Sequence, residues 1–256
     1  MSTDPESRRG FGPFLEGVGP TYTAMDGTTK VIRYNSIPDL REALAVHGAT
    51  TAAFLVEPIQ GEAGIVVPDD GYLREAYELC HQHNVLLIAD EIQTGLCRTG
   101  KMLCSEWDNV KPDILLLGKA LSGGMYPVSA VLANEPILGC IRPGEHGSTY
   151  GGNPLGCAVA SAALKVLIEE DLAARAQRLG EIFREGIRAI GSPLVATVRG
   201  RGLLNAVVID ESKSSRGRTA WQFCLLLKER GVLAKPTHVN MWVALIRFVS
   251  LTVDVL

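Results

Sequence analysis

The sequence lacks the features of a membrane or exported protein. No apolar run among its 256 residues reaches the roughly 18 residues needed to span a bilayer. The first ten residues contain no apolar segment typical of a secretory signal, and their acidic residues are untypical of a transit peptide. We expect no membrane partner and a cytoplasmic location, with mitochondria as the alternative if an upstream segment carries an address.

Cysteine pairs at metal-binding spacing are also missing. The six cysteines show no CxxC motif, and most of them lie in apolar or helical segments. This usage is typical of reduced thiols in an intracellular protein, and it argues against the common zinc motifs. We predict no metal site.

A patch of one charge sign is absent as well. The 25 Lys and Arg residues and the 28 Asp and Glu residues give a formal net charge of -3, and the basic residues are scattered. Without a basic stripe, a nucleic-acid partner is not expected. The chain is 46% hydrophobic and 21% charged, which is enough apolar material for a real core. We expect a small-molecule ligand.

The pattern along the chain predicts three parts. Residues 1–36 are rich in Gly, Pro, Ser and Thr and lack periodicity, which predicts an extended or looped lead-in. In residues 37–191, short apolar segments alternate with helical ones, which is typical of a mixed, mostly parallel sheet. Residues 192–256 change to an α+β pattern and predict a smaller C-terminal domain. One long helix over about 155–190 is expected to link the two domains.

The boundaries of the predicted elements follow from the apolar runs and the turn residues. In the larger domain we predict helices over 38–47 and 72–83, and strands over Ala52–Glu57, Val85–Asp90, Ile114–Leu117 and Pro127–Ala133. In the smaller domain we predict extended segments at Val195–Arg199, Gly202–Ile209 and Val232–Ala234, a polar loop over Glu211–Arg218 and a helix over about 219–230.

Two ionisable side chains follow neighbouring predicted strands. Lys119 is a lone amine between an apolar run and a small-residue turn, and Asp90 ends an earlier strand. The carboxyl ends of such strands form the crevice where α/β folds bind ligands. A pyridoxal phosphate enzyme needs a lysine to hold the aldehyde as a Schiff base and a carboxylate to keep the pyridine nitrogen protonated. Taken singly, Lys119 could be a solvated lysine, and Asp90 could cap a helix or bind a metal.

Longer motifs extend this pair to a family resemblance. The chain resembles the class-III aminotransferases of pyridoxal-phosphate fold type I from about residue 3 to 238, through four motifs in order: Val56–Gly64, Ala89–Gly95, Leu117–Gly124 and His146–Pro154. Within that family, the runs that begin at Gly118 and Pro143 and the later Val198–Ala206 are similar to the ornithine aminotransferases. The resemblance implies an α/β large domain, present in part, and a small α+β C-terminal domain.

The resemblance implies roles around the cofactor ring. Lys119 would bind pyridoxal 5'-phosphate covalently and then move a proton as general base and acid. Asp90 would pair with the pyridinium nitrogen, and Ile92 would pack against one face of the ring or else belong to the core. Gln93 would donate a hydrogen bond to the phenolic oxygen. Glu57 is expected to support the cofactor site by hydrogen bonding.

The phosphate site implied by the resemblance lies in a later motif. Ser148 and Thr149 would donate to the cofactor phosphate of a neighbouring subunit, which implies a homo-oligomer such as a homodimer. The alternative from the residues alone is a helix cap before Gly152.

Substrate choice, by the same resemblance, depends on two further residues. In ornithine aminotransferases a glutamate at the position of Glu62 pairs with an arginine of the small domain, so that the δ-amine of ornithine enters first. Arg247 is the candidate for that arginine, although Val239–Leu245 before it is longer and more apolar than the family pattern. The alternative for Glu62 is a solvated loop carboxylate.

The implied reaction converts L-ornithine and 2-oxoglutarate to glutamate 5-semialdehyde and glutamate, in arginine catabolism and proline biosynthesis. Two alternatives stay open. In the family, a segment before the position of Met1 supplies a phosphate-binding turn, so this polypeptide could be a non-catalytic fragment or depend on a complementary chain. Another class-III aminotransferase, acting on acetylornithine, 4-aminobutyrate or lysine, would share the same cofactor residues.

Overall fold

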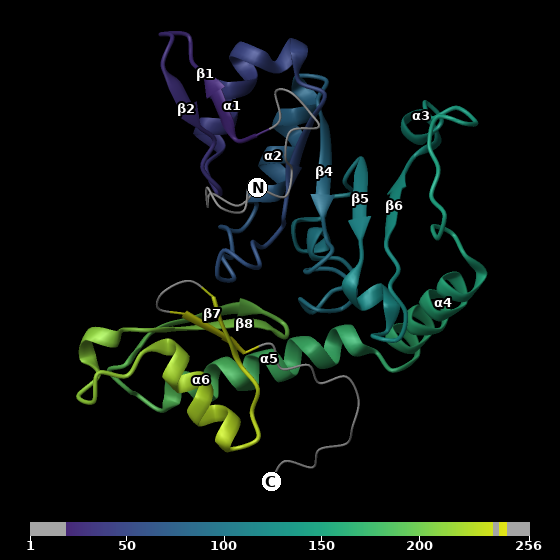
Figure 1. Cartoon of the computed structure of the whole chain (residues 1–256). Helices are drawn as coiled ribbons and strands as arrows, with labels where there is room; N and C mark the ends of the chain where they lie inside the picture. The colour runs from purple at the N-terminus through teal and green to yellow at the C-terminus, as the bar shows by residue number, and fades with distance from the viewer. Residues whose placement is uncertain (1–18, 238–240, 245–256) are drawn as a thin grey trace.

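A four-stranded mixed sheet forms the centre of the larger domain in the computed structural model, which describes residues 19–237 and 241–244 (Figure 1). Three strands run parallel, and the fourth is antiparallel to its neighbour, in the order β3-β4-β5-β6. The strands are β3 (Ala53–Val56), β4 (Leu86–Asp90), β5 (Ile114–Leu117) and β6 (Ala130–Ala133). The prediction of an α/β fold with a mixed, mostly parallel sheet is confirmed.

Two amphipathic helices cover this sheet. The helices α1 (Ile37–His47) and α2 (Tyr72–Gln82) pack on each other, and α2 lies against β4. Ser36 caps α1 by accepting a hydrogen bond from the amide of Asp39. The shared core consists of aliphatic side chains from both helices and the strands, including Leu40, Leu44, Val56, Leu73, Leu79 and Leu87.

Short helical segments connect the strands of the larger domain. Most are single turns that redirect the chain toward the next element. They are η2 (Gly48–Thr50), η3 (Cys104–Asp108), η4 (Lys119–Ser122) and α3 (Glu135–Leu138).

The lead-in segment contains a strand pair that the sequence did not predict. Strands β1 (Thr21–Thr23) and β2 (Thr29–Val31) pair antiparallel around a tight turn. Asp26 accepts a hydrogen bond from the amide of Thr28 at 3.0 Å and so shapes the turn, in which Gly27 has a φ of 80°. The lead-in expected to be extended or looped is therefore extended here, and the pairing was not predicted because strands of three residues are too short to show a period of two.

The predicted helix over 155–190 is two helices, which corrects that prediction. Helix α4 (Pro154–Glu169) ends before Asp171, whose backbone is left-handed at φ 47°, and α5 (Leu172–Ala189) begins after it. Three consecutive acidic residues at the end of α4 face the negative end of the helix dipole, and Asp is a poor helix former. The two helices still run from one domain to the other (Figure 1). None of the helices in the described residues has both the length and the apolar character required to cross a bilayer.

The small domain is an antiparallel sheet with helix α6 (Ala220–Glu229) and helix α5 packed on it. Its strand order is β7 (Val195–Arg201), β8 (Leu204–Ile209), β10 (Met241–Ala244), β9 (Lys235–Thr237). The short η5 (Glu211–Lys213) lies in the predicted polar loop. The predicted extended segment Val232–Ala234 is not a strand, because the amide of Val232 donates to the carbonyl of Leu227 at 2.9 Å and closes the end of α6.

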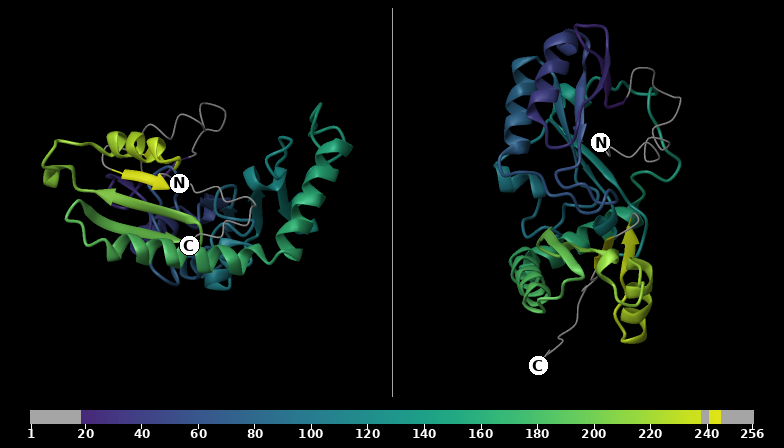
Figure 2. Two further views of the ribbon diagram at one scale, coloured as in Figure 1. Left: turned by 90° about the horizontal axis from the view of Figure 1, so that it is seen from below. Right: turned by 90° about the vertical axis from the view of Figure 1, so that its left-hand side faces the viewer.

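The small domain lies directly below the larger domain in the right-hand view of Figure 2. Ile59, Ile65 and Cys104 of the larger domain form one buried cluster with Leu204 and Ala206 of β8. In Figure 1 the arrowheads of β4 and β5 point toward the layer formed by α5 and β8. The carboxyl ends of the parallel strands therefore face the small domain.

Candidate functional site

The strand ends bring three ionisable residues together. Val56 pairs in register with Ala89, so Glu57 and Asp90 are the next residues on adjacent parallel strands, and Lys119 follows the end of β5 by two residues. Burial raises the pKa of Glu57, and the hydrogen bond from the amide of Gly61 partly opposes that shift. The nearby charge of Asp90 raises this pKa and that of Lys119 lowers it, both by smaller amounts. Glu57 therefore lies within electrostatic reach of both residues, as the position of the strands requires.

Lys119 has an unusual backbone conformation. Its φ is 43°, in the left-handed region that non-glycine residues seldom adopt, and it opens η4 directly after Gly118. Its carbonyl accepts a hydrogen bond from Ser122 Oγ at 2.9 Å, and that oxygen in turn accepts from the amide of Gly124 at 3.0 Å. This turn holds the backbone of Lys119 while its side chain remains exposed.

The residues after Asp90 lie at the same strand ends. Asp90 Oδ1 accepts a hydrogen bond from the amide of Ile92 at 3.0 Å, which fixes the carboxylate. A Cβ on Gly118 would lie 3.3 Å from Ile92 Cγ2, so Ile92 packs beside the residue that precedes Lys119. A Cβ on Gly61 would lie 1.7 Å from Gln93 Oε1, so the Gln93 amide needs a glycine at that position.

Glu91 is a structural residue that the sequence did not reveal. Its side chain is 1% exposed and accepts hydrogen bonds from Thr94 Oγ1, the amide of Cys104 and the amide of Ser105, each at 2.8 Å. These bonds tie the turn after β4 to η3 and so hold Asp90 and Ile92 in place. The adjacent acids Asp90 and Glu91 look equivalent in the sequence, and only the fold shows that Glu91 is internal.

Ser148 and Thr149 lie in an exposed segment before α4. Ser148 Oγ accepts a hydrogen bond from the amide of Gly151 at 2.8 Å, while Asn153 caps α4 by accepting from the amide of Gly156. The helix cap is therefore Asn153, four positions beyond Thr149, and not one of the two residues for which that alternative was weighed. The phosphate role of Ser148 and Thr149 stays a prediction.

Glu62 contacts a cation of the small domain. Its Oε2 lies 2.6 Å from Lys235 Nζ on β9, and both side chains are more than half exposed. Arg199 on β7 donates two hydrogen bonds to the carbonyl of Gly64, at 3.2 and 2.8 Å, and so fixes the loop that carries Glu62. Arg247 lies outside the described residues, and its role stays a prediction. Sequence reasoning missed Lys235, because spacing alone does not identify a partner 173 positions away.

The chemistry at the strand ends fits pyridoxal phosphate. An amine, a carboxylate, an amide and an aliphatic side chain come from Lys119, Asp90, Gln93 and Ile92, and all four lie at or just after the carboxyl ends of adjacent strands. These are the groups that a protonated pyridine ring with an aldehyde requires. Glu57 follows the end of the neighbouring strand β3, and its Oε2 accepts a hydrogen bond from the amide of Gly61 at 3.0 Å.

The chain is similar to known aminotransferases over nearly its whole length. Residues 1–253 match the family model described as aminotransferase class-III. The chain is 63% identical over 241 residues to the ornithine aminotransferase car2 of Schizosaccharomyces pombe, covering 94% of this chain and 54% of that protein. It is 60% identical over 241 residues to the ornithine aminotransferase of Emericella nidulans, covering 94% and 52%.

A solved structure agrees with this assignment. The ornithine aminotransferase from Toxoplasma gondii, crystallized with partial occupancy of PLP at its active site, aligns with a TM-score of 0.83 and 47% identity. The alignment covers 95% of this chain and 54% of that one. The chain spans about half the length of the relatives it matches. The fold-type-I prediction is confirmed, and the chain belongs to the class-III aminotransferase family.

Proposed function

We propose that this chain carries the lysine-bearing part of an ornithine δ-aminotransferase. The reaction transfers the δ-amino group of L-ornithine to 2-oxoglutarate, giving glutamate 5-semialdehyde and glutamate, with pyridoxal phosphate as cofactor. The observation that carries this proposal is the placement of Lys119 and Asp90 at the ends of adjacent parallel strands. The charges of both residues act on the pKa of the nearby Glu57. The identities of 60% and 63% to two ornithine aminotransferases support the substrate.

The residues of the chain divide the chemical work between them. Pyridoxal phosphate, when bound, supplies a reactive aldehyde and a ring that withdraws electrons. Lys119 Nζ would hold the aldehyde end of the cofactor and would serve as the general base and acid that moves the proton during transfer. Asp90 keeps the proton on the ring nitrogen. Gln93 orients the ring through its phenolic oxygen, and Ile92 shields one face.

The substrate end of the site is charged. The α-carbon of ornithine bears a carboxylate and the δ-carbon does not, so the Glu62 carboxylate repels entry by the α-end more than entry by the δ-end. The pair between Glu62 and Lys235 is exposed, and such pairs contribute only about 0–1 kcal/mol. The ion pair therefore breaks at a small cost in free energy, and the free Lys235 ammonium can then bind a carboxylate of 2-oxoglutarate. This proposal gives Lys235 part of the role that the family resemblance implies for Arg247.

The test follows nitrogen from ornithine. The purified chain is incubated with pyridoxal phosphate, 2-oxoglutarate and ornithine labelled at its δ-nitrogen or, separately, at its α-nitrogen. We expect label in glutamate from the δ-labelled substrate, and none with the Lys119→Met variant. Label from the α-position, or faster transfer from acetylornithine or 4-aminobutyrate, would assign a different class-III reaction.

The assembly and the compartment belong to the same proposal. A homodimer would let Ser148 and Thr149 serve the cofactor of the neighbouring subunit, since both are exposed on this chain. The cytoplasm is the proposed location, with mitochondria as the alternative. Sedimentation of the purified chain and imaging of a fluorescent fusion test the two statements separately.

A further inference from the structure

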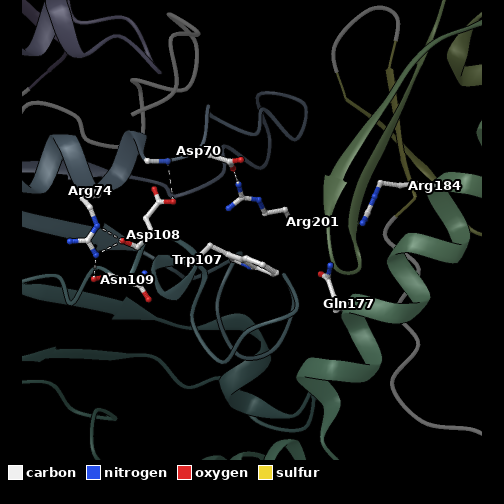
Figure 3. Close-up of a pocket in the computed structure, with 9 residues that line it drawn as sticks. Asp70, Arg74, Trp107, Asp108, Asn109, Gln177, Arg184 and Arg201 are labelled. Carbon is white, nitrogen blue, oxygen red and sulfur yellow. Dashed lines mark hydrogen bonds and ion pairs between the residues drawn. The ribbon is translucent and has the colours of Figure 1, made fainter.

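A polar cavity of about 560 Å³ lies between the two domains, away from the strand ends. The larger domain contributes residues at the start of α2 and in η3, and the small domain contributes α5 and β7 (Figure 3). Its lining consists of Asp70, Gly71, Arg74, Trp107, Asp108, Asn109, Gln177, Arg184 and Arg201. None of the residues assigned to the cofactor lines it. The volume lies within the range of ordinary small-molecule sites, about 300–1,000 Å³.

Arg184 is the most informative residue of this cavity. It is 8% exposed, and within the described part of the chain no carboxylate lies within ion-pair distance of it. Its Nη1 donates to the carbonyl of Gly202 at 3.0 Å and to Asn205 Oδ1 at 2.7 Å. Burial lowers the pKa of Arg184, because a charge removed from water is destabilised. The charges of Glu181 and Glu185 oppose this shift through space, but the direct hydrogen bonds of Arg184 go only to neutral oxygens. A buried cation of this kind is favourable for an incoming anion.

Arg201 of β7 supplies a second guanidinium to the lining, and its side chain points toward Asp70 (Figure 3). It lies 5.4 Å from the centre of the Trp107 ring, and Lys101 lies 5.3 Å from the same ring. Its partner Asp70 is held at 2.5 Å but is 95% exposed, so an anion from solution can compete for Arg201. Arg201 therefore brings a positive charge to the lining that its exposed partner neutralises only weakly.

The other acid of the lining is already engaged. The Asp108 carboxylate accepts hydrogen bonds from the amides of Gly71 and Leu73, at 3.3 and 3.0 Å. It therefore caps the N-terminus of α2. Arg74 donates to the backbone carbonyls of Asp108 and Asn109. Three guanidiniums and two carboxylates line the cavity, and one of those carboxylates is committed to a helix end.

We propose that this interdomain cavity is a binding site for a small anion with at least two negative charges, held between Arg184 and Arg201. Phosphate and carboxylate groups both suit guanidinium, which offers two parallel N–H donors to either. The site does not depend on pyridoxal phosphate or on Lys119. Occupation would link α5 and β7 of the small domain to η3 of the larger one.

Binding is measured on the full chain by thermal unfolding with increasing inorganic phosphate or succinate, against sodium chloride at matched ionic strength. We expect saturable stabilisation by phosphate or succinate and none by chloride. The anion with the lower half-saturation concentration identifies the ligand class as a phosphate compound or a dicarboxylate. Equal stabilisation by chloride, or stabilisation that does not saturate, would overturn the proposal.

Variants separate this site from general charge effects. Arg201→Gln should weaken binding about tenfold or more, a loss of about 1.4 kcal/mol or more, whereas Arg178→Gln, an exposed arginine on α5, should leave binding unchanged. Arg184→Gln should act as Arg201→Gln does, but Arg201 decides the result if the buried variant fails to fold. Asp70→Asn removes the competing carboxylate and should tighten binding.

The site is also expected to be independent of the cofactor lysine, so Lys119→Met should bind the anion as the unaltered chain does. Equal anion binding by Arg201→Gln and Arg178→Gln would refute the site.

Discussion

At the scale of single residues, Glu57 connects the site to pH. Because burial raises its pKa above the ordinary 4.5, the folded chain binds this proton more tightly than the unfolded chain does. The contribution of Glu57 to the free energy of unfolding is therefore greatest below pH 4.5 and falls as pH rises toward the raised value. Each unit of that shift corresponds to about 1.4 kcal/mol.

The Glu57→Gln variant tests this sign. Glutamine keeps an acceptor for the amide of Gly61 but cannot ionise. Relative to the unaltered chain, we expect the variant to gain stability as pH rises above 4.5, measured by urea unfolding at a series of pH values. Glu62→Gln, on the exposed loop, serves as the control. Parallel stability curves for Glu57→Gln and the unaltered chain would contradict the burial of this carboxyl.

Removal of the buried Glu91 side chain is expected to change the free energy of unfolding more than removal of Glu57 does. Replacing Glu91 by alanine leaves the buried amides of Cys104 and Ser105 without an acceptor, and each unsatisfied group costs about 1–3 kcal/mol. We expect Glu91→Ala to lower the free energy of unfolding by about 3 kcal/mol or more. Glu106→Ala, which removes an exposed glutamate of η3, should change it little. Similar losses in both variants would show that Glu91 is not the internal anchor.

The residues that the sequence could and could not identify differ in a physical respect. Lys119 and Asp90 were found because each stands at the end of its own apolar strand, and strand ends of a parallel sheet share one edge. Glu91 and Lys235 were missed because their importance lies in partners far along the chain. A sequence shows which residues are adjacent in the chain, and not which carboxylate turns inward or which lysine reaches across a domain boundary.

At the scale of elements, strong apolar runs gave reliable predictions. The strands at Ile114–Leu117 and Leu86–Asp90 were located to within one residue, because buried parallel strands are apolar along their whole length. The β1–β2 pair was missed because three residues cannot show a period. The break between α4 and α5 was missed because it interrupts the helical pattern at a single left-handed residue, Asp171.

The break at Asp171 can be tested through its backbone. A residue other than glycine pays about 1 kcal/mol or more to hold a left-handed conformation, and glycine does not. We expect Asp171→Gly to keep or raise the free energy of unfolding, and Asp171→Val to lower it by about 1–2 kcal/mol. Glu170→Val, at the neighbouring position with φ -94°, is the matched control. Equal effects of valine at the two positions in thermal unfolding would show that the break is not set by backbone strain.

At the scale of the whole molecule, the join between the domains depends on close backbone packing. Gly202 has a φ of 50°, and a Cβ there would lie 2.6 Å from the backbone nitrogen of Gly100. The amide of Leu203 donates to the carbonyl of Arg98 at 2.9 Å across the same contact. The small domain is thus held where the carboxyl ends of the strands face it.

Replacing Gly202 by alanine should separate the domains. We expect Gly202→Ala to lower stability by more than the left-handed backbone alone requires, and to increase cleavage between the domains in limited proteolysis. Gly217→Ala is the matched control, because Gly217 has a φ of 60° with no atom near its Cβ position. The Gly217→Ala variant should lose about 1 kcal/mol of the free energy of unfolding. Equal losses in the two variants would mean that the contact with Gly100 does not hold the domains together.

The central claim is that Lys119 is the amine that binds the cofactor aldehyde. The most direct measurement adds pyridoxal phosphate to the purified chain, records its absorbance spectrum, reduces it with borohydride and maps the modified lysine by mass spectrometry. The account predicts an absorbance band near the boundary of visible and ultraviolet light and modification at Lys119, both lost in Lys119→Met and retained in Lys165→Met, an exposed lysine of α4. Modification spread over surface lysines, or a band that survives Lys119→Met, would contradict the account.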